Sequence, residues 1–315
     1  MSGDADVLPH DRGPATLTGS MQFDLTSRIA GRSYRIFVSR PDGDAPAGGF
    51  PVFVAVDGNM AFPIAATVNA TFALAGAAAL VVGVGYPTDV PLELMSLRTR
   101  DMTPPTPVGR LPQRPGLPPP RVEDYGGDDA FFRFLVEELM PLLVRAYPID
   151  RGDLTLYGHS FGGLFTVGVL LKHPDAFKTF IASSPSLFWN RRSVFGELGA
   201  FAAKLRGGQA SPRVLLMAGG REESVPKPIP PMILDQVAAR AGWIPPLLRP
   251  WVAHWFVRRM LSEWRMIGNA RRLATRLRRV RGARDQVRFA RLAGEDHITA
   301  LPASIGRAFD FLLRA

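Results

Sequence analysis

The chain of 315 residues contains no cysteine and has only five histidines. The absence of cysteine excludes disulfides, thiolate zinc sites, iron–sulfur clusters and a cysteine nucleophile. No apolar run approaches the roughly 18 residues that a transmembrane helix needs. The first twenty residues contain three aspartates and no apolar core, so we expect no secretory signal and a cytoplasmic protein. With so few and scattered histidines, we expect neither a metal site nor another cofactor.

The positive charge lies in one part of the sequence. The net charge is +10, and residues 221–291 contain 16 Lys and Arg against 5 Asp and Glu, so the remainder is almost neutral. Such a basic segment can attract an anionic substrate, contact a membrane surface, or form a helix face exposed to solvent. No nucleic-acid-binding motif accompanies the arginines, so we do not expect a nucleic-acid partner.

Short apolar segments alternate with helical patterns along most of the chain. Residues 21–29 and 33–39 alternate apolar and polar positions, which predicts a β-hairpin. Further strands are predicted at residues 51–56, 78–84, 154–157, 179–182, 213–218 and 286–292. Helices are predicted at residues 60–76, 128–146, 162–172 and 302–314. Strand–helix–strand order predicts an α/β fold with a mostly parallel twisted sheet and helices on both faces.

We expect one α/β domain over residues 21–315, preceded by a flexible tail over residues 1–20. Residues 104–120 contain eight prolines and predict a surface loop. Within the long helical pattern, Pro141 is expected to kink or end the helix locally.

The segment GHSFG at residues 158–162 matches the pattern G-x-S-x-G. It follows a predicted strand and begins a predicted helix, which is the context of a nucleophile elbow. Glycines on both sides of the serine permit the sharp turn, and the helix N-terminus favours developing negative charge. We therefore expect Ser160 to be a nucleophile; the alternative is a glycine-rich turn around an inert serine.

A serine nucleophile needs a base and an acid from elsewhere in the chain. In α/β-hydrolases the order is nucleophile, acid, histidine, with the histidine after the last strand. His297 fits this order, whereas His159 is expected to pack structurally within the turn. Glu222 is the first candidate for the acid and Glu223 the second, because both follow the strand at residues 213–218.

The oxyanion hole is expected to combine the backbone N–H of Phe161 with a second N–H after the strand at residues 51–56. That second donor is expected at Gly58 or Asn59.

Seven motifs in chain order resemble one family. They are VDGN (56–59), VVGVGYP (81–87), RTRDMTP (98–104), GGDDAFFRFLVEELMP (126–141), YGHSFGGLF (157–165), SSPSLFWN (183–190) and GEDH (294–297). Together they resemble the putative-esterase branch of the α/β-hydrolases, which includes the enterochelin-type ferric-siderophore esterases and is similar to S-formylglutathione hydrolases and mycolyltransferases. The resemblance covers roughly residues 20–224 and 263–314.

The resemblance implies an α/β-hydrolase fold with Ser160 as nucleophile and His297 as base, and it places Glu222 near the acid position. It also implies that Arg98 or Asp101 lines the substrate pocket. We further expect Trp189 of the SSPSLFWN motif to contact the substrate. Siderophore esterases of this group open trilactone backbones whose iron complexes are strongly anionic.

The chain departs from the family at three places where specificity is set. Ile298 and Thr299 follow His297 where the group commonly has a small pair such as Gly-Ser. The proline-rich loop is longer than in close relatives. Residues 225–262 resemble an insertion.

Within this insertion, residues 247–262 predict a basic helix with tryptophan and phenylalanine near one face. The helix is expected to be a lid over an apolar pocket, a membrane-surface helix, or a helix packed into the core.

These observations predict a serine carboxylic-ester hydrolase that acts through an acyl-enzyme on a small-molecule ester, of a siderophore type or otherwise anionic. An acyltransferase with the same Ser–His machinery and a non-catalytic membrane-surface or binding protein on this fold are the alternatives. The sequence leaves the natural ester and the oligomeric state open.

Overall fold

The computed structural model describes residues 16–110, 121–208, 210–226, 228–229, 231–240, 245–280 and 284–314. Within these residues, eight strands form one sheet: β1 (Ser20–Ser27), β2 (Arg32–Ser39), β3 (Phe50–Val56), β4 (Leu80–Gly85), β5 (Ile149–His159), β6 (Thr179–Ser183), β7 (Arg213–Gly219) and β8 (Val287–Leu292). The helices are α1 (Gly58–Ala73), α2 (Pro91–Asp101), α3 (Asp128–Arg133), α4 (Met140–Ala146), α5 (Phe161–Lys172), α6 (Trp189–Arg192), α7 (Leu198–Arg206), α8 (Pro231–Arg240), α9 (Arg249–Trp264), α10 (Met266–Arg278) and α11 (Ala300–Leu313).

The strands lie in the order β1-β2-β4-β3-β5-β6-β7-β8. The β1–β2 hairpin is antiparallel, and β2 also pairs antiparallel with β4. Every other pairing in the sheet is parallel. The mostly parallel sheet expected from the sequence is therefore confirmed. Its apolar strands β3 and β4 are buried on both faces, as is typical of parallel strands.

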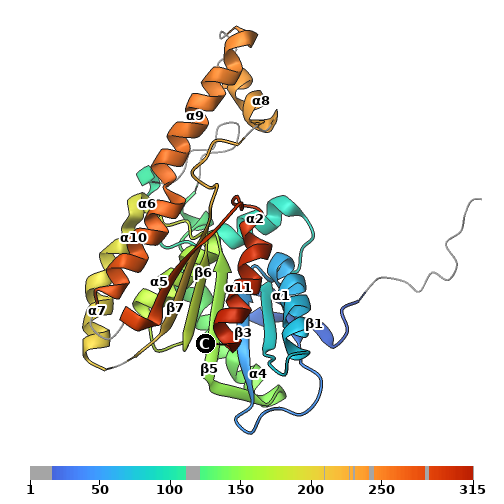
Figure 1. Ribbon diagram of the computed structural model, residues 1–315. Helices are drawn as coiled ribbons and strands as arrows, with labels where there is room; N and C mark the ends of the chain where they lie inside the picture. Colours follow the sequence, from blue (N-terminus) through green and yellow to red (C-terminus); the bar gives the residue numbers. More distant parts are fainter. Residues whose placement is uncertain are drawn as a thin grey trace, which may run out of the picture.

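Two layers of helices cover the sheet (Figure 1). Helices α1 and α11 pack together on one face, while α3, α4, α5, α7 and α10 supply the core of the other. Strand β3 shows why both layers are needed, because its side chains alternate between them. Val54 belongs to the core under α5, and Phe53 stacks on Phe309 of α11 with ring centroids 4.6 Å apart.

The long helix predicted at residues 128–146 is one continuous path in three parts. Between α3 and α4 the segment Phe134–Leu139 widens into a π-helix, and Pro141 follows at the start of α4. A proline cannot donate an N–H to the preceding turn, so a local widening before it is the physical result of the expected kink.

Several elements were not predicted from the sequence, although α10 buries Ile267, Ala270, Leu273 and Leu277 at helical spacing. Helices α2, α7 and α10 are among them, and β5 extends five residues before the predicted strand. The flexible tail expected at residues 1–20 lies outside the described residues up to residue 15, and β1 begins at Ser20. Residues 111–120 of the proline-rich loop also lie outside them.

The segment expected to be an insertion contains α8 and α9. These helices contact each other and extend from the body beyond the carboxyl edge of the sheet (Figure 1). Trp251 and Trp255 of α9 are 77% and 60% exposed, so the alternative of a helix packed into the core is wrong. Among the described residues, no helix is long and apolar enough to cross a membrane.

Candidate active site

The turn between β5 and α5 has a conformation that few residues adopt. Ser160 has φ 59° and ψ −113°, a positive φ that is rare outside glycine. Strand and helix approach so closely that a Cβ on Gly158 would lie 2.2 Å from the carbonyl oxygen of Gly162. A Cβ on Gly163 would lie 2.9 Å from the carbonyl oxygen of Ser183. Contact between backbones therefore requires glycine at 158, as the motif predicts, and also at 163, which lies outside the motif.

The side chains of Ser160, His297 and Glu222 form a chain of contacts. The Ser160 Oγ lies 3.0 Å from Nε2 of His297, and Nδ1 of His297 lies 3.4 Å from Oε2 of Glu222. All three lie at the carboxyl edge of the sheet, since Ser160 follows β5, Glu222 follows β7 and His297 follows β8, with β6 between β5 and β7. Residues up to 137 positions apart in the sequence thus meet in one site.

Glu222, rather than Glu223, is the carboxylate that faces His297. The side chain of Glu222 is 1% exposed, and its Oε1 accepts hydrogen bonds from the Gly219 N–H at 2.7 Å and from the Ser184 hydroxyl. These donors fix the carboxylate and leave Oε2 for the imidazole. Glu223 points elsewhere, because its Oε1 accepts the Gly268 N–H of α10 at 2.8 Å.

Asp296 shapes the turn that presents His297. Its Oδ1 accepts the backbone N–H groups of Ile298 at 2.9 Å and Thr299 at 3.0 Å, and these hydrogen bonds hold the pKa of Asp296 below its usual value. The carboxylate therefore organises the backbone around His297 and does not orient the imidazole itself.

The two expected oxyanion donors lie on neighbouring turns. Phe161 begins α5, and Gly58 and Asn59 begin α1 after β3. A Cβ on Gly162 would lie 3.0 Å from Oδ2 of Asp57, so the two turns touch. The Asn59 side chain is held by the backbone of Tyr86, with Nδ2 donating to its carbonyl at 2.9 Å and Oδ1 accepting its N–H at 2.8 Å. The oxyanion roles of Phe161, Gly58 and Asn59 stay a prediction.

A buried ion pair supports this turn. Arg98 donates from Nε and Nη2 to the two carboxylate oxygens of Asp57, both at 2.7 Å, and both side chains are almost fully buried. Asp57 has φ 64°, so its turn is itself unusual. The Arg98 guanidinium also lies 5.6 Å from the ring centre of Phe161. Arg98 therefore neutralises a carboxylate beside the start of α5, where a negative charge would oppose an oxyanion.

The expected pocket role of Asp101 is wrong, because its side chain is buried and occupied. It is 2% exposed, and its Oδ2 accepts the hydroxyls of Tyr34 at 3.0 Å and Tyr86 at 3.2 Å. Its Oδ1 lies 3.0 Å from Nη1 of Arg32. Burial raises the pKa of Asp101, which the Arg32 charge and the two tyrosine hydrogen bonds partly offset. The carboxylate is thus a structural acceptor beneath the site.

Trp189 is 5% exposed and also differs from the expected substrate contact. Its Nε1 donates to Oγ1 of Thr106 at 2.9 Å, and its ring packs edge-on against Phe161 at 5.1 Å. The indole therefore packs against Phe161, the residue after Ser160, and its hydrogen bond to Thr106 fixes the start of the proline-rich loop beside it.

The ring of His159 packs beside that of His297. Their ring centres are 4.9 Å apart, and Nδ1 of His159 lies 3.1 Å from the Ser183 hydroxyl. Burial lowers the pKa of His159 to about 3, with smaller contributions from His297 and Arg98. His159 is therefore neutral near pH 7 and places no positive charge against His297.

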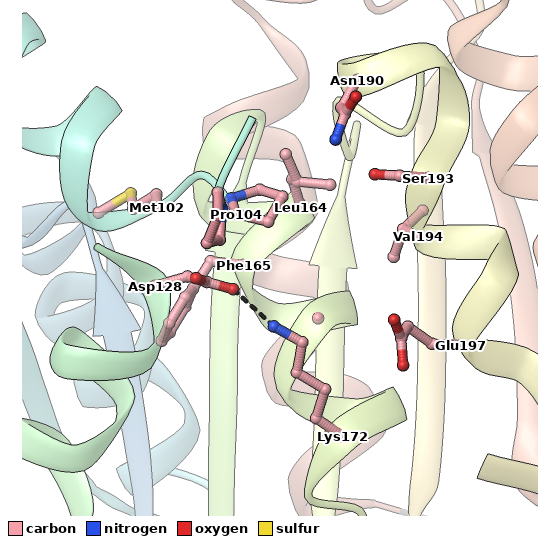
Figure 2. Close-up of a pocket in the computed structure, with 12 residues that line it drawn as sticks. Met102, Pro104, Asp128, Leu164, Phe165, Lys172, Asn190, Ser193, Val194 and Glu197 are labelled. Atoms are coloured by element: carbon pink, nitrogen blue, oxygen red, sulfur yellow. Dashed lines mark hydrogen bonds and ion pairs between the residues drawn. The ribbon is translucent and has the colours of Figure 1, made fainter. Parts of the chain in front are cut away.

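A cavity of about 250 Å³ lies along α5, beside the helix rather than at Ser160 (Figure 2). Leu164 and Lys172 of α5 line it, and Lys172 forms a 2.9 Å ion pair with Asp128 there. Among the described residues, no group of three histidine or carboxylate side chains is placed to hold a metal ion.

Comparison with known proteins identifies the family. Residues 116–244 match the family described as "Putative esterase". The chain is 33% identical over 307 residues to the ferri-bacillibactin esterase BesA of Bacillus subtilis (strain 168), covering 95% of this chain and 91% of BesA. It is 30% identical over 306 residues to the siderophore triacetylfusarinine C esterase of Aspergillus fumigatus, covering 93% of each. The chain belongs to the putative-esterase family. It is a carboxylic-ester hydrolase.

Solved structures of the family have the same fold. The BES protein from Bacillus cereus superposes with a TM-score of 0.74 at 27% identity, covering 96% of this chain and 99% of that one. The siderophore hydrolase EstB from Aspergillus nidulans gives a TM-score of 0.74 at 28% identity, covering 96% and 97%. The α/β-hydrolase fold expected from the sequence is therefore confirmed.

Sequence reasoning did not single out two residues of the site. Ser184 donates to Glu222, and Ser186 has its Oγ 3.4 Å from that of Ser160. Both belong to the SSPSLFWN motif, and the positive φ of Ser184 has no signal in the sequence. Only the adjacency of β5, β6 and β7 brings this loop between Ser160 and Glu222.

Removing the buried arginine is expected to destabilise the fold. In Arg98→Met, Asp57 would stay buried without its partner, so the free energy of unfolding is expected to fall by about 3–5 kcal/mol. Urea denaturation measures this loss. Arg133→Met is the matched control, because its pair with Glu137 is exposed and its loss is expected to change little. Equal losses in the two variants would contradict the role of the buried pair.

The low pKa of His159 predicts a pH dependence of stability. The unfolded chain takes up a proton below pH about 6.5, whereas folded His159 stays neutral down to about pH 3. This contribution to stability is complete above the unfolded pKa and is lost as pH falls, by about 2 kcal/mol between pH 7 and pH 5. Denaturant titrations of His159→Gln are expected to lack this part of the loss. The exposed control His254→Gln is expected to behave as the wild type, and an unchanged pH slope in His159→Gln would refute the assignment.

Proposed function

We propose that Ser160, His297 and Glu222 act as a catalytic triad that hydrolyses a carboxylic ester through an acyl-enzyme. The observation that carries this proposal is the continuous contact from Ser160 Oγ to Nε2 of His297 and from Nδ1 to Glu222. Ser160 and His297 are also partly exposed, with the imidazole 40% exposed, so an ester can reach them.

In acylation, Nε2 of His297 takes the hydroxyl proton while Ser160 Oγ attacks the ester carbonyl carbon. The oxyanion is stabilised by the N–H of Phe161 at the start of α5, together with an N–H of Gly58 or Asn59. Glu222 stabilises the imidazolium, which then protonates the leaving alcohol. A water molecule, deprotonated by His297, attacks the acyl-enzyme and releases the acid.

We propose a siderophore-type ester as the substrate class. Two of the relatives are named for siderophores, ferri-bacillibactin for BesA and triacetylfusarinine C for the Aspergillus fumigatus enzyme. The strong positive charge of residues 221–291 begins at the acid loop, beside Glu222, and complements an anionic iron complex. Departures at Ile298, in the proline-rich loop and in the α8–α9 segment concern the choice of ester rather than the reaction.

Substitutions in the triad test the mechanism. Ser160→Ala is expected to abolish turnover and labelling by a fluorophosphonate probe, because the hydroxyl forms the acyl-enzyme. Glu222→Gln is expected to lower kcat by about 10⁴-fold, since the imidazole loses its partner. Glu223→Gln is the matched control one residue along, and it is expected to keep kcat because Glu223 bonds to α10. Probe labelling of another residue, or a larger loss in Glu223→Gln, would contradict the proposal.

Substrate comparison tests the ester class. Mass spectrometry is expected to show stepwise opening of a ferric trilactone siderophore to its linear acids. kcat/KM for an anionic ester is expected to fall between about 0.01 and 0.1 M salt, where the Debye length shortens from about 30 to 10 Å. A neutral ester of similar size is the control and is expected to respond little. Equal salt responses, or no trilactone opening, would reject this substrate class. Transfer of the acyl group to an added alcohol in preference to water would favour the acyltransferase.

A further inference from the structure

The α8–α9 arm, residues 231–264 as far as the structure describes them, is fixed at its base and extends away from the body (Figure 1). At the base, Trp264 stacks on Phe188 at 4.9 Å with an interplanar angle of 6°. Nearby, Arg192 donates to the carbonyl oxygen of Glu263 at 2.8 Å. Helix α9 runs from the far tip, where residues 246–248 form a short turn, down to α10 at the body. Among the described residues, these contacts hold the base of the arm against the body.

The tip of the arm is apolar and exposed. Its large exposed side chains are Leu247, Leu248, Trp251 and Trp255. The opposite side of α9 is the packed one, because Ala253 and Val257 are buried. The exposed side chains therefore form a patch that the α8–α9 contact does not use, and two tryptophans are its largest members. Such patches mark interaction surfaces.

The charge on the arm identifies the partner of this patch. The arm itself contains four arginines and two acidic residues, Asp235 and Glu263, and Arg259 forms a 3.1 Å ion pair with Glu263. Residues 265–280 at its base add six arginines and no acidic residue. Arg258 and Arg259 are exposed about two turns from Trp251, and the Arg259 guanidinium lies 5.7 Å from the Trp255 ring centre. A second copy of the arm would bring the same positive charge against this one, which disfavours self-association. Tryptophans beside arginines are suited to an anionic surface with an apolar layer beneath it.

We propose that the tip of the α8–α9 arm docks onto an anionic lipid surface. Along α9, Trp251 and Arg259 are separated by about 12 Å at 1.5 Å per residue. Interfacial helices bury their apolar side chains about 5–10 Å deep at the headgroup boundary. A tip that enters end-on therefore places its leucines and tryptophans at that boundary, with the arginines at the phosphates.

Docking in this way orients the catalytic edge. The arm extends beyond the carboxyl edge of the sheet, which carries Ser160, so the site faces the bilayer when the tip is bound. Attachment would be peripheral, and it needs no reaction at Ser160. The proposal is therefore independent of the proposed function and has its own readout.

Vesicle binding by the full chain tests the proposal. Co-sedimentation is expected with phosphatidylcholine vesicles containing a quarter phosphatidylglycerol and not with pure phosphatidylcholine, together with a blue shift of tryptophan fluorescence. Trp251→Ser/Trp255→Ser is expected to lower the partition coefficient by about tenfold or more. Arg258→Gln/Arg259→Gln is expected to lower it by about fivefold per arginine and to weaken its salt dependence.

Matched controls separate docking from general attraction by a basic protein. Leu74→Ser removes an exposed apolar side chain from the body, and Arg145→Gln/Arg151→Gln removes two exposed arginines far from the arm. Both are expected to bind vesicles as the wild type does. Binding that the controls reduce as much as the arm variants would overturn the proposal, as would no binding to anionic vesicles at low salt. A concentration-dependent dimer in light scattering that Trp251→Ser/Trp255→Ser abolishes, without vesicle binding, would assign the tip to a second copy instead.

Discussion

The close approach of two backbones at Ser160 is the constraint on which the site depends. Strand β5 and helix α5 meet at Gly158 and Gly162 with no space for a side chain, and Ser160 adopts φ 59° between them. This strain is held by the sheet, because the Ser160 N–H donates to Ser183 at 3.0 Å. The hydroxyl therefore stands at the edge of the sheet, directly before a helix N-terminus.

The remaining parts of the site are joined to each other before any ester binds. The loops that carry Glu222 and His297 are linked by Gly220 N–H to Leu292 at 2.7 Å and by Arg221 N–H to Glu295 at 2.8 Å. These links continue the pairing of β7 with β8. The sheet thus fixes the distance between Glu222 and His297, which is the preorganisation that the proposed triad requires.

Buried carboxylates near the site are paired with arginines, whereas the arginines of α9 and α10 outnumber the acidic residues around them. Near the site, Asp57 and Asp101 are buried, and each has an arginine partner, Arg98 and Arg32. A buried carboxylate without such a partner would be costly. On α9 and α10, by contrast, arginines stand in excess with few acidic partners in the sequence around them. That excess is available to an anionic ester or surface from outside.

The local sequence pattern was sufficient to predict those features that depend on residues close together in the chain. The GHSFG segment between an apolar strand and a helix was enough to predict the sharp strand–turn–helix at Ser160, because strand, glycine and helix signals are all local. The alternation of apolar strands and helices determined the fold class for the same reason. His297 could be chosen because so few histidines exist and one of them follows the last strand.

Pairings between distant segments were decided by tertiary structure alone. Glu222 and Glu223 have the same side chain in adjacent positions, and only burial beneath Ser184 separates them. Asp101 has a charge in the sequence that suits a substrate pocket, yet its partners Tyr34 and Arg32 come from β2, far earlier in the chain. Residue type and spacing determined which groups can react, whereas sheet order determined which of them meet, because contacts across strands are not encoded by any local period.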